Sequence, residues 1–369
     1  MKILFIDNCY PDFLTKIERE LTEQKIFDYD KIINYYYSYS FGTSDFYSKN
    51  ISSLGFEAKD IIINFDRLQV AWSMKNAPLL NILTKILKTI PTVRNVYQLL
   101  GNPLVLMAQI KKEKPDIVYV QCIGSLPPFL TKQIKKHTKL LVGQIASKFP
   151  PDNFFSNYDL ILSSLPNMVE KIRIIGVKSE YFKIGFESTV LNKIKHNKKY
   201  EVTHLGGYGK IHRERNQILD YIARKTRVDF WGYGISNLLT NSPILKHFHG
   251  EAWGMDYYNI LADSKITITG HIKEVAGKYA NNMTLYEATG CGALLMTDYK
   301  ENLGDIFEIG KEVIAYSSPE DLSNKIEYYL KHEDERKTIA LAGQKRTLRD
   351  HTYKERMIEL KQILQKYYE

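Results

Sequence analysis

The stretch YANNMTLYEATGCGALLMTD (Tyr279–Asp298) decides the fold, because it joins a capped helix to a buried strand through two glycines. Asparagine side chains cap free backbone N–H groups well, so we expect Asn281 and Asn282 at the helix N-terminus. Gly290 and Gly292 end the helix and release the chain into the apolar run ALLMT, which is the pattern of a strand buried on both faces. A helix that leads into such a strand is the repeating unit of an α/β fold.

The same alternation of strand-like and helix-like runs extends along the whole chain in two series. The first series is Lys2–Asp7 (KILFID), Ala58–Asn64 (AKDIIIN), Asp116–Cys122 (DIVYVQC), Lys139–Ile145 (KLLVGQI) and Tyr158–Ser163 (YDLILS). The second series is Glu201–Gly207 (EVTHLGG), Arg227–Gly232 (RVDFWG), Lys265–Gly270 (KITITG), Gly292–Thr297 (GALLMT) and Glu312–Tyr316 (EVIAY). Between them, Leu191–Tyr200 (LNKIKHNKKY) is polar and basic, which is typical of a linker. We therefore predict an N-terminal domain over 1–192 and a C-terminal domain over 200–350. A final helix is predicted over 351–369, and it is able to pack back onto the first domain.

The composition is that of a globular protein, since 44% of the 369 residues are hydrophobic and 25% are charged. The net charge of +9 fits nucleic acid, an anionic membrane surface or phosphorylated small molecules as partners. Cys9, Cys122 and Cys291 lie far apart, which excludes a cysteine zinc site and a disulfide framework. The N-terminus is too polar for a signal peptide, and no run reaches the ~20 apolar residues of a membrane span, so we expect a cytoplasmic protein.

The helix that begins near Asn282 offers free N–H groups and the positive end of its dipole, which suit a diphosphate. Glu287 lies about one and a half turns along this helix. A carboxylate at that position is able to accept hydrogen bonds from both hydroxyls of a ribose. On spacing alone, a capped core helix with a solvent-facing Glu287 is an equal alternative.

A glycine-rich loop, LGGYGKIHRERN (Leu205–Asn216), follows the first strand of the second series. Gly206, Gly207 and Gly209 permit a tight turn and close approach of the backbone. The cations Lys210, His212, Arg213 and Arg215 cluster at the start of the following helix, where they suit a pyrophosphate. The alternative is a glycine turn followed by a solvated, basic helix start.

Two further strand ends carry candidate ligand contacts. Gly232 and Gly234 follow the strand RVDFW and let a nucleobase or ribose approach the backbone beside Tyr233. His271 follows the strand KITITG, and a histidine at the carboxyl end of a strand is placed for a cleft. Strand-end glycines are common in any such sheet, and the chain has nine histidines, so chance placement is the alternative.

The stretch Tyr279–Asp298 resembles the donor-binding motif of glycosyltransferases with the GT-B fold, and is most similar to that of the spore-maturation CgeB-like group. The resemblance covers most of the C-terminal half and is weaker in YPDFL (Tyr10–Leu14) and NFDRLQVAW (Asn64–Trp72) of the N-terminal half. It implies a GT-B architecture, in which two Rossmann-like domains face each other across a cleft and the C-terminal domain binds a nucleotide sugar. The chain departs from many retaining members at Tyr279, where they carry a second acid, so the stereochemical outcome stays open.

By this resemblance the helix near Asn282 faces the donor diphosphate, Glu287 binds the ribose, and Arg213 and His212 contact the donor. The predicted donor-binding set is Gly206, Gly207, Lys210, His212, Arg213, Gly232, Tyr233, His271, Asn281, Asn282, Met283, Thr284 and Glu287. An inverting enzyme needs a carboxylate to deprotonate the acceptor hydroxyl, and the candidates are Asp7, Asp12 and Asp66, with Asp45 as a further one. Turn and capping roles explain these aspartates equally well.

The sequence therefore predicts a hexosyltransferase of polysaccharide biosynthesis that moves a sugar from a nucleotide-diphosphate sugar to a hydroxyl of a glycan or lipid-linked acceptor. We expect no obligatory cofactor and no metal, because the loop cluster HFHGE (His247–Glu251) is a weak metal signal. A sugar-nucleotide epimerase of the same fold and a basic nucleic-acid-binding protein are the alternatives. Dispersed basic residues speak against nucleic acid, and the N-terminal half lacks the acids and histidines that an epimerase needs around its sugar.

Six apolar residues at helical spacing mark an amphipathic helix in the N-terminal half. They are Leu79, Ile82, Leu83, Ile86, Leu87 and Ile90, with Lys85 and Lys88 on the other face. The favoured interpretation is a surface helix that covers a sheet. The alternative is a helix on the inner face of a membrane that brings the enzyme to a lipid-linked acceptor.

Overall fold

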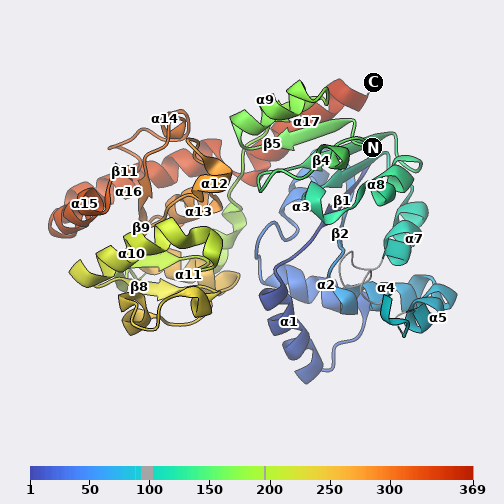
Figure 1. Cartoon of the computed structure of the whole chain (residues 1–369), viewed down its shortest axis with the longest axis horizontal. Helices are drawn as coiled ribbons and strands as arrows, with labels where there is room; N and C mark the ends of the chain where they lie inside the picture. Colours follow the sequence, from blue (N-terminus) through green and yellow to red (C-terminus); the bar gives the residue numbers. More distant parts are fainter. Residues whose placement is uncertain (88, 93–102, 195–196, 369) are drawn as a thin grey trace. The chain divides into compact units, whose positions relative to one another are not determined.

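The computed structural model of the chain describes residues 1–87, 89–92, 103–194 and 197–368. The chain divides into two compact units: unit 1 comprises Met1–Lys183 and Met357–Glu369, and unit 2 comprises Ile184–Arg356. Each unit is built on one parallel sheet with its own helices (Figure 1). The predicted α/β fold with two Rossmann-like sheets is confirmed, while a cleft between the domains stays a prediction.

Unit 1 has a six-stranded parallel sheet in the order β2-β1-β3-β4-β5-β6. Its strands are β1 (Lys2–Asp7), β2 (Glu57–Ile62), β3 (Ile117–Val120), β4 (Leu140–Gln144), β5 (Leu160–Ser163) and β6 (Ser179–Tyr181). Strands β3 and β5 are buried at every residue, and β1 is buried at its four central residues. Parallel strands that helices cover on both faces are expected to be apolar throughout in this way.

The helices of unit 1 connect these strands, and the C-terminal helix joins them from Met357 onward. They are α1 (Pro11–Glu23), α2 (Tyr29–Ser38), α3 (Phe46–Ser52), α4 (Asp66–Asn76), α5 (Pro78–Leu87), α7 (Pro103–Glu113), α8 (Pro128–Lys135), α9 (Pro166–Ile174) and α17 (Tyr353–Tyr368). Lys366 and Tyr367 of α17 both donate to Glu180 Oε1 at 2.6 Å, and Tyr368 donates to Asp116 Oδ1 at 2.9 Å. These bonds tie α17 to β6 and to the start of β3.

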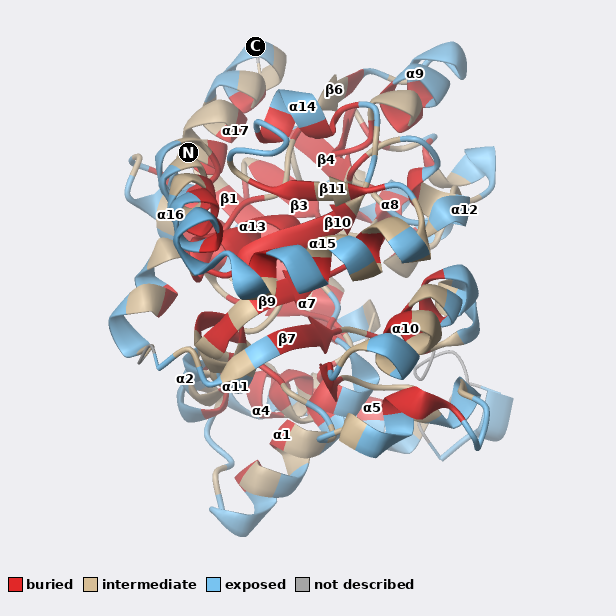
Figure 2. Ribbon diagram, turned by 90° about the vertical axis from the view of Figure 1, so that its left-hand side faces the viewer, coloured by how far each residue is buried: buried red, intermediate tan, exposed pale blue. Residues whose placement is uncertain are grey.

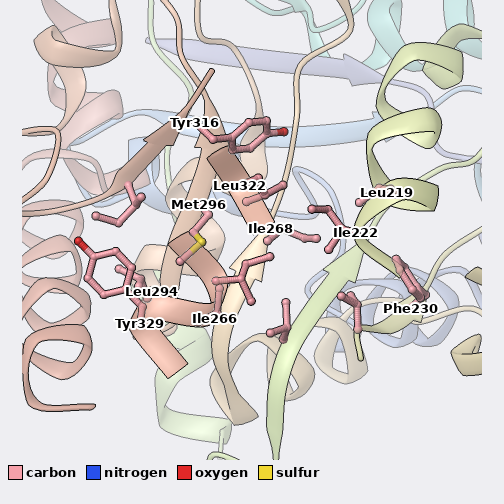
Figure 3. Close-up of a cluster of buried hydrophobic side chains, with 14 of the residues drawn as sticks. Leu219, Ile222, Phe230, Ile266, Ile268, Leu294, Met296, Tyr316, Leu322 and Tyr329 are labelled. Carbon is pink, nitrogen blue, oxygen red and sulfur yellow. The ribbon is translucent and has the colours of Figure 1, made fainter. Parts of the chain in front are cut away.

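Unit 2 has a five-stranded parallel sheet in the order β11-β10-β9-β7-β8. Its strands are β7 (Tyr200–Leu205), β8 (Asp229–Trp231), β9 (Ser264–Ile268), β10 (Leu294–Asp298) and β11 (Ile314–Tyr316). Its helices are α10 (Arg213–Lys225), α11 (Met255–Asp263), α12 (Lys273–Ala276), α13 (Met283–Gly290), α14 (Leu303–Ile306), α15 (Pro319–Lys331) and α16 (Glu333–Asp350). Figure 3 shows the core on one face of this sheet, where Ile266, Ile268 and Met296 pack with Leu219 and Ile222 of α10.

The units divide between Lys183 and Ile184, upstream of the linker predicted over 191–200. Phe186 accounts for the difference, because its buried ring packs closely on Gly290 of unit 2. A Cβ added to Gly290 would lie 2.5 Å from that ring. Ser188–Lys193 then forms a 3-10 helix, so the start of the predicted linker already belongs to unit 2. Residues 195–196 of that linker lie outside the described residues.

The predicted amphipathic helix is present as α5, but its favoured interpretation is wrong. Leu79 is 81% exposed, Ile82 56% and Ile86 58%, whereas the polar side chains of Asn81 and Thr84 are buried. Figure 2 shows both exposed and buried residues along α5. The apolar face therefore does not cover the sheet. Lys88 of the predicted helix lies outside the described residues. Within the described parts of the chain, no helix is long and apolar enough to cross a membrane.

Candidate functional site

The carboxyl ends of β7 and β9 lie next to each other in unit 2, at the point where the strand order reverses. From β7 the sheet continues to β8 on one side, and from β9 through β10 to β11 on the other. In open parallel sheets, ligands bind beyond the carboxyl ends of the strands at such a reversal. The loop that follows β7 and the segment Thr269–His271 that follows β9 border this point.

The loops after β7 and β8 touch each other, and this contact explains their glycines. Gly206 N donates to Trp231 O at 3.1 Å. Gly232 has a φ of +145°, and a Cβ there would lie 1.7 Å from Gly206 O, so a larger residue does not fit. A Cβ on Gly207 would lie 2.8 Å from the ring of Tyr233. These predicted site residues therefore hold the two loops together at the edge of the sheet.

Arg215 is a buried cation in this region that the predicted donor-binding set did not include. Its guanidinium donates to Gly207 O, and its Cγ would lie 3.2 Å from a Cβ added to Gly270. Its Nε has no hydrogen-bond partner among the residues that the structure describes. Burial lowers the pKa of the guanidinium, because the charged form loses hydration. The charge of Arg215 thus lies between the loops that follow β7 and β9.

The positions of the apolar residues along α10 show that Arg215 lies on the core-facing side of this helix. The buried side chains of the helix are Arg215, Asn216, Leu219 and Ile222, which share one face. Arg215 therefore occupies a core-facing position where an apolar residue is usual. Lys210 and Arg213, which the sequence favoured, are exposed at the 3-10 turn before α10 and at its first residue.

Two histidines next to Arg215 are held in the neutral form. Burial and the charge of Arg215 lower the pKa of His204 to about 3 and that of His212 to about 4. His204 Nδ1 lies 2.9 Å from Ile268 O. Neither His204 Nε2 nor His212 Nδ1 has a partner within the described chain. At neutral pH the positive charge at this point therefore comes from arginine and lysine, not from these two histidines.

His271 follows β9, and its side chain is fully buried. Its Nδ1 lies 2.6 Å from Oδ1 of Asp298, the last residue of β10, and the same oxygen accepts from its backbone N at 3.1 Å. Although burial opposes it, the bond and charge of His271 and the nearby Lys300 hold the pKa of Asp298 below its usual range. A carboxylate next to Nδ1 keeps a proton on that nitrogen. The opposite nitrogen, Nε2, has no partner in the described part of the chain.

The N-terminus of α13 reaches the same edge of the sheet. Asn282 Oδ1 accepts from Thr284 N at 2.9 Å and so caps the helix. Asn282 Nδ2 donates to Thr269 Oγ1 at 3.1 Å, which links the cap to the residue that follows β9. Asn281 and Met283 flank the cap and are half-buried. The predicted cap is present, and it lies beside the strand reversal.

Glu287 is buried, so its alternative interpretation as a solvent-facing residue is wrong. Tyr257 of α11 donates to Glu287 Oε2 at 2.8 Å. Burial raises the pKa of Glu287 to about 7, against the opposing hydrogen bonds of Tyr257 and Tyr258. A carboxylate has about four acceptor positions, so these contacts leave room for ribose hydroxyls.

His249 and Glu251 of the HFHGE cluster have other partners in the structure. His249 stacks on Trp231 with ring centroids 4.5 Å apart. Glu251 accepts from Trp253 Nε1 at 2.8 Å, and Trp253 in turn stacks on Tyr233 with centroids 5.4 Å apart. Across the described residues, no group of three or more His, Cys, Asp or Glu side chains is arranged to hold a metal ion.

Asp28-Tyr29-Asp30 has the D-x-D spacing with which metal-using sugar transferases hold a cation, and the sequence analysis missed it. Asp28 Oδ1 caps α2 by accepting from Lys31 N at 3.1 Å. Asp30 forms an ion pair with Lys75 of α4. Both carboxylates therefore have structural roles in unit 1.

The predicted base candidates of unit 1 differ in their surroundings. Asp7 ends β1, at the reversal between β1 and β3. Its carboxylate accepts from Thr43 Oγ1 at 2.6 Å and from Asn8 N at 2.8 Å, and burial raises its pKa to about 6. Asp12 and Asp66 are exposed in the first turns of α1 and α4, where acids stabilise the helix dipole. Asp7 is therefore the strongest of these candidates.

Residues 213–362 match the model of a protein family described as glycosyl transferase-like. The match begins at the first residue of α10 and ends within α17, so it contains every candidate site residue of unit 2 from Arg213 onward. Among curated protein sequences, none matches this chain.

Solved structures are similar to this chain over its whole length. Sucrose-phosphate synthase from Thermosynechococcus elongatus matches with a TM-score of 0.61 at 10% identity, over 100% of this chain and 99% of its own. Anabaena HepE in complex with UDP-glucose matches with a TM-score of 0.60 at 12% identity, over 99% and 100%. A glycosyltransferase from Rickettsia africae matches with a TM-score of 0.58 at 12% identity, over 99% and 98%.

At such identities the likeness establishes the fold, which is the GT-B type of α/β fold with two parallel sheets. A putative UDP-N-acetylglucosamine 2-epimerase from Listeria monocytogenes shares it with a lower TM-score of 0.51, at 11% identity over 100% of this chain and 96% of its own. Because this fold carries more than one activity, the site and the family match must decide between them.

Proposed function

We propose that the protein is a glycosyltransferase that moves a hexosyl group from a nucleotide-diphosphate sugar to a hydroxyl of a glycan or lipid-linked acceptor, without an obligatory metal. The observation that carries the proposal is a pair of buried polar atoms without partners in the described chain, Arg215 Nε and His271 Nε2, beside the strand reversal of unit 2. Such a group costs about 1–3 kcal/mol unless it is bonded, and a ligand bonded to both atoms recovers this energy. The glycosyl transferase-like family match supports a sugar nucleotide as that ligand.

The predicted contacts divide the donor into three parts. The capped N-terminus of α13, with the exposed Arg213 and Lys210, binds the diphosphate. The charge of Arg215 stabilises the leaving nucleoside diphosphate as its negative charge grows. Glu287 accepts the ribose hydroxyls through its remaining acceptor positions. HepE, which has the same fold, was solved in complex with UDP-glucose, and this supports a donor of that class.

Unit 1 binds the acceptor in this proposal. Asp7 is the base of an inverting reaction: its pKa of about 6 allows it to be ionised at neutral pH and still take up a proton. A retaining reaction needs no such base, because the donor phosphate takes the proton.

A sugar-nucleotide epimerase is the second candidate, because one protein of this fold is a putative 2-epimerase. The two activities differ in their products. A transferase releases a nucleoside diphosphate, whereas an epimerase returns an isomeric sugar nucleotide.

A thermal-shift screen with UDP, GDP, dTDP, CMP and ADP, each with Mg²⁺ or with EDTA, tests the proposal. A ligand at 100 times its dissociation constant adds about 2.7 kcal/mol to the free energy of unfolding, so a real site is visible. We expect one diphosphate to raise the melting temperature equally under both conditions. The corresponding sugar nucleotide is then incubated with the protein, and its products are separated by chromatography. No shift with any nucleotide contradicts the proposal.

A further inference from the structure

Helix α5 turns its apolar side outward, which is the reverse of the usual arrangement in a water-soluble domain. Its exposed apolar side chains are Leu79, Ile82, Leu83 and Ile86, and Met74 of α4 and Ile90 after α5 are exposed as well. We call these six residues the α5 face. Exposed apolar side chains grouped on one helix, unlike scattered ones, mark an interaction surface.

The polar side of the same helix is packed inside unit 1. Asn81 and Thr84 are 7% and 3% exposed. Ser73 Oγ of α4 donates to Asn81 Oδ1 at 3.3 Å, and Thr84 Oγ1 donates to Asn81 O at 3.0 Å. The Ser73–Asn81 bond joins α4 to the buried polar side of α5, and the Thr84 bond lies within α5, so both polar side chains are bonded while the apolar side chains face away.

The stretch of sequence that contains this face carries charge of one sign, although Lys75 of α4 is paired with Asp30 from outside the stretch. Between Arg67 and Lys112 the sequence contains no aspartate or glutamate. The same stretch contains the cations Arg67, Lys75, Lys85, Lys88, Arg94, Lys111 and Lys112, of which Lys88 and Arg94 lie outside the described residues. Lys85 is exposed on α5 itself, beside Ile86. An apolar helix face in a stretch with basic and no acidic residues is complementary to an anionic lipid surface.

We propose that α5 lies in the surface of an anionic membrane, with the α5 face in the boundary between headgroups and acyl chains and Lys85 among the headgroups. The helix has 10 residues, so it lies on the membrane and does not span it. A second copy of the chain is a poorer occupant, because two such faces would bring stretches of the same charge together. This inference goes beyond the proposed function and does not depend on a sugar nucleotide.

Sedimentation of the full chain with lipid vesicles tests the proposal. We expect binding to vesicles of phosphatidylglycerol and phosphatidylcholine in equal amounts, and much weaker binding to pure phosphatidylcholine. Lys85→Gln should lower the partition coefficient about fivefold, since each basic residue near an anionic surface contributes about 1 kcal/mol. The double variant Ile82→Gln/Ile86→Gln should lower it about tenfold or more, because two apolar side chains leave the lipid.

Ile174→Gln is the matched control, because Ile174 is an exposed isoleucine of α9 in the same unit. This variant should bind vesicles like the unchanged protein, and all variants should keep its melting temperature. Absence of binding to the anionic vesicles contradicts the proposal. So does an equal loss in the control, or a dimer in light scattering that the α5 double variant dissociates while vesicles bind nothing.

Discussion

His271 Nδ1 and Asp298 Oδ1 lie 2.6 Å apart where β9 and β10 end, and this contact determines what His271 can offer a ligand. The carboxylate bonds Nδ1 and so fixes the orientation of the ring, which leaves Nε2 as the nitrogen available to a ligand. Asp298 therefore acts on a ligand through His271. The pair corresponds to the arrangement in which a carboxylate orients a functional histidine.

This relationship predicts that His271→Ala and Asp298→Ala are not additive. Each should weaken binding of the donor nucleotide sugar about tenfold, which is the net value of one hydrogen bond. The double variant should lose little more than either single variant, because the second change removes a group that no longer has a function. Isothermal titration calorimetry of the four proteins measures the coupling. Lys311→Met is the control, because Lys311 is exposed in unit 2 and paired with Glu308, and losses that simply add would show that Asp298 acts separately.

Arg213→Ala should weaken binding of the nucleoside diphosphate by about 1.5–3 kcal/mol, the range for hydrogen bonds to charged groups. Binding of the bare nucleoside should change little, because Arg213 is assigned to the diphosphate. Arg224→Ala is the matched control, since Arg224 is an exposed arginine in the last turn of the same helix, α10. Calorimetric titrations with both ligands distinguish the outcomes, and equal losses for nucleoside and diphosphate would indicate a disturbed fold.

Glu287→Gln should stabilise the protein at high pH and at the same time weaken binding of the donor. The folded-state pKa of Glu287 is about 7 and the ordinary value 4.5, so between these values the folded protein holds the extra proton. The free energy of unfolding therefore falls as the pH rises through this window, by up to about 3 kcal/mol for this group. Glutamine has no charge to bury, so the variant should be more stable than the unchanged protein at pH 8 and equally stable at pH 4.5.

The same variant should bind the donor more weakly by about 1.5–3 kcal/mol, because an amide accepts ribose hydroxyls less well than a carboxylate. Denaturant unfolding at the two pH values and nucleotide titration at pH 8 provide the two measurements. A variant with unchanged nucleotide affinity would remove Glu287 from the site. A variant with unchanged pH dependence would contradict the raised pKa.

The strands could be predicted because a strand that is buried on both faces has an uninterrupted run of apolar residues. KILFID has the same bounds as β1, and each of the other predicted runs overlaps a strand. Strand β6 (Ser179–Tyr181) has no such signal, since it is three residues long and lies at the edge of its sheet. The start of unit 2 before Phe186 could not be predicted either, because Gly290, on which Phe186 packs, is far away in the sequence.

The site could be predicted only where the neighbours in the chain determine it. Asn282 was identified as a cap from its place before a helix, and Glu287 from its spacing to that cap. The burial of Glu287 depends on Tyr257 of another helix, and no local spacing indicates that contact. For α5, periodicity showed which side chains share a face but not which way the face points. The polar Asn81 and Thr84 on its opposite face were the available clue.

Gly232→Ala should destabilise unit 2 by about 2 kcal/mol or more, because the added methyl group meets a backbone oxygen in a conformation that suits glycine. A Cβ there would lie 1.7 Å from Gly206 O. Gly250→Ala is the matched control: its φ is also positive, at +95°, but nothing lies within 4 Å of the added Cβ. The control should cost about 1 kcal/mol. Melting temperatures of both variants test this, and equal losses would contradict a specific contact between the loops after β7 and β8.

Asp7→Asn should remove a pH-dependent step from turnover. If Asp7 is the base, it must be ionised, so the rate should rise as the pH increases through its pKa of about 6 and level off above it. Turnover is followed as release of the nucleoside diphosphate from the sugar nucleotide that the thermal-shift screen identifies. The amide cannot accept the proton, so the variant should lose about 10²–10⁴ in kcat and the rise near pH 6 should disappear. Asp12→Asn is the control, because Asp12 is exposed in the first turn of α1 and should retain both the rate and the pH profile. Full activity of the Asp7→Asn variant would show that Asp7 is not the base. The donor phosphate would then take the proton of the acceptor hydroxyl, as in a retaining reaction.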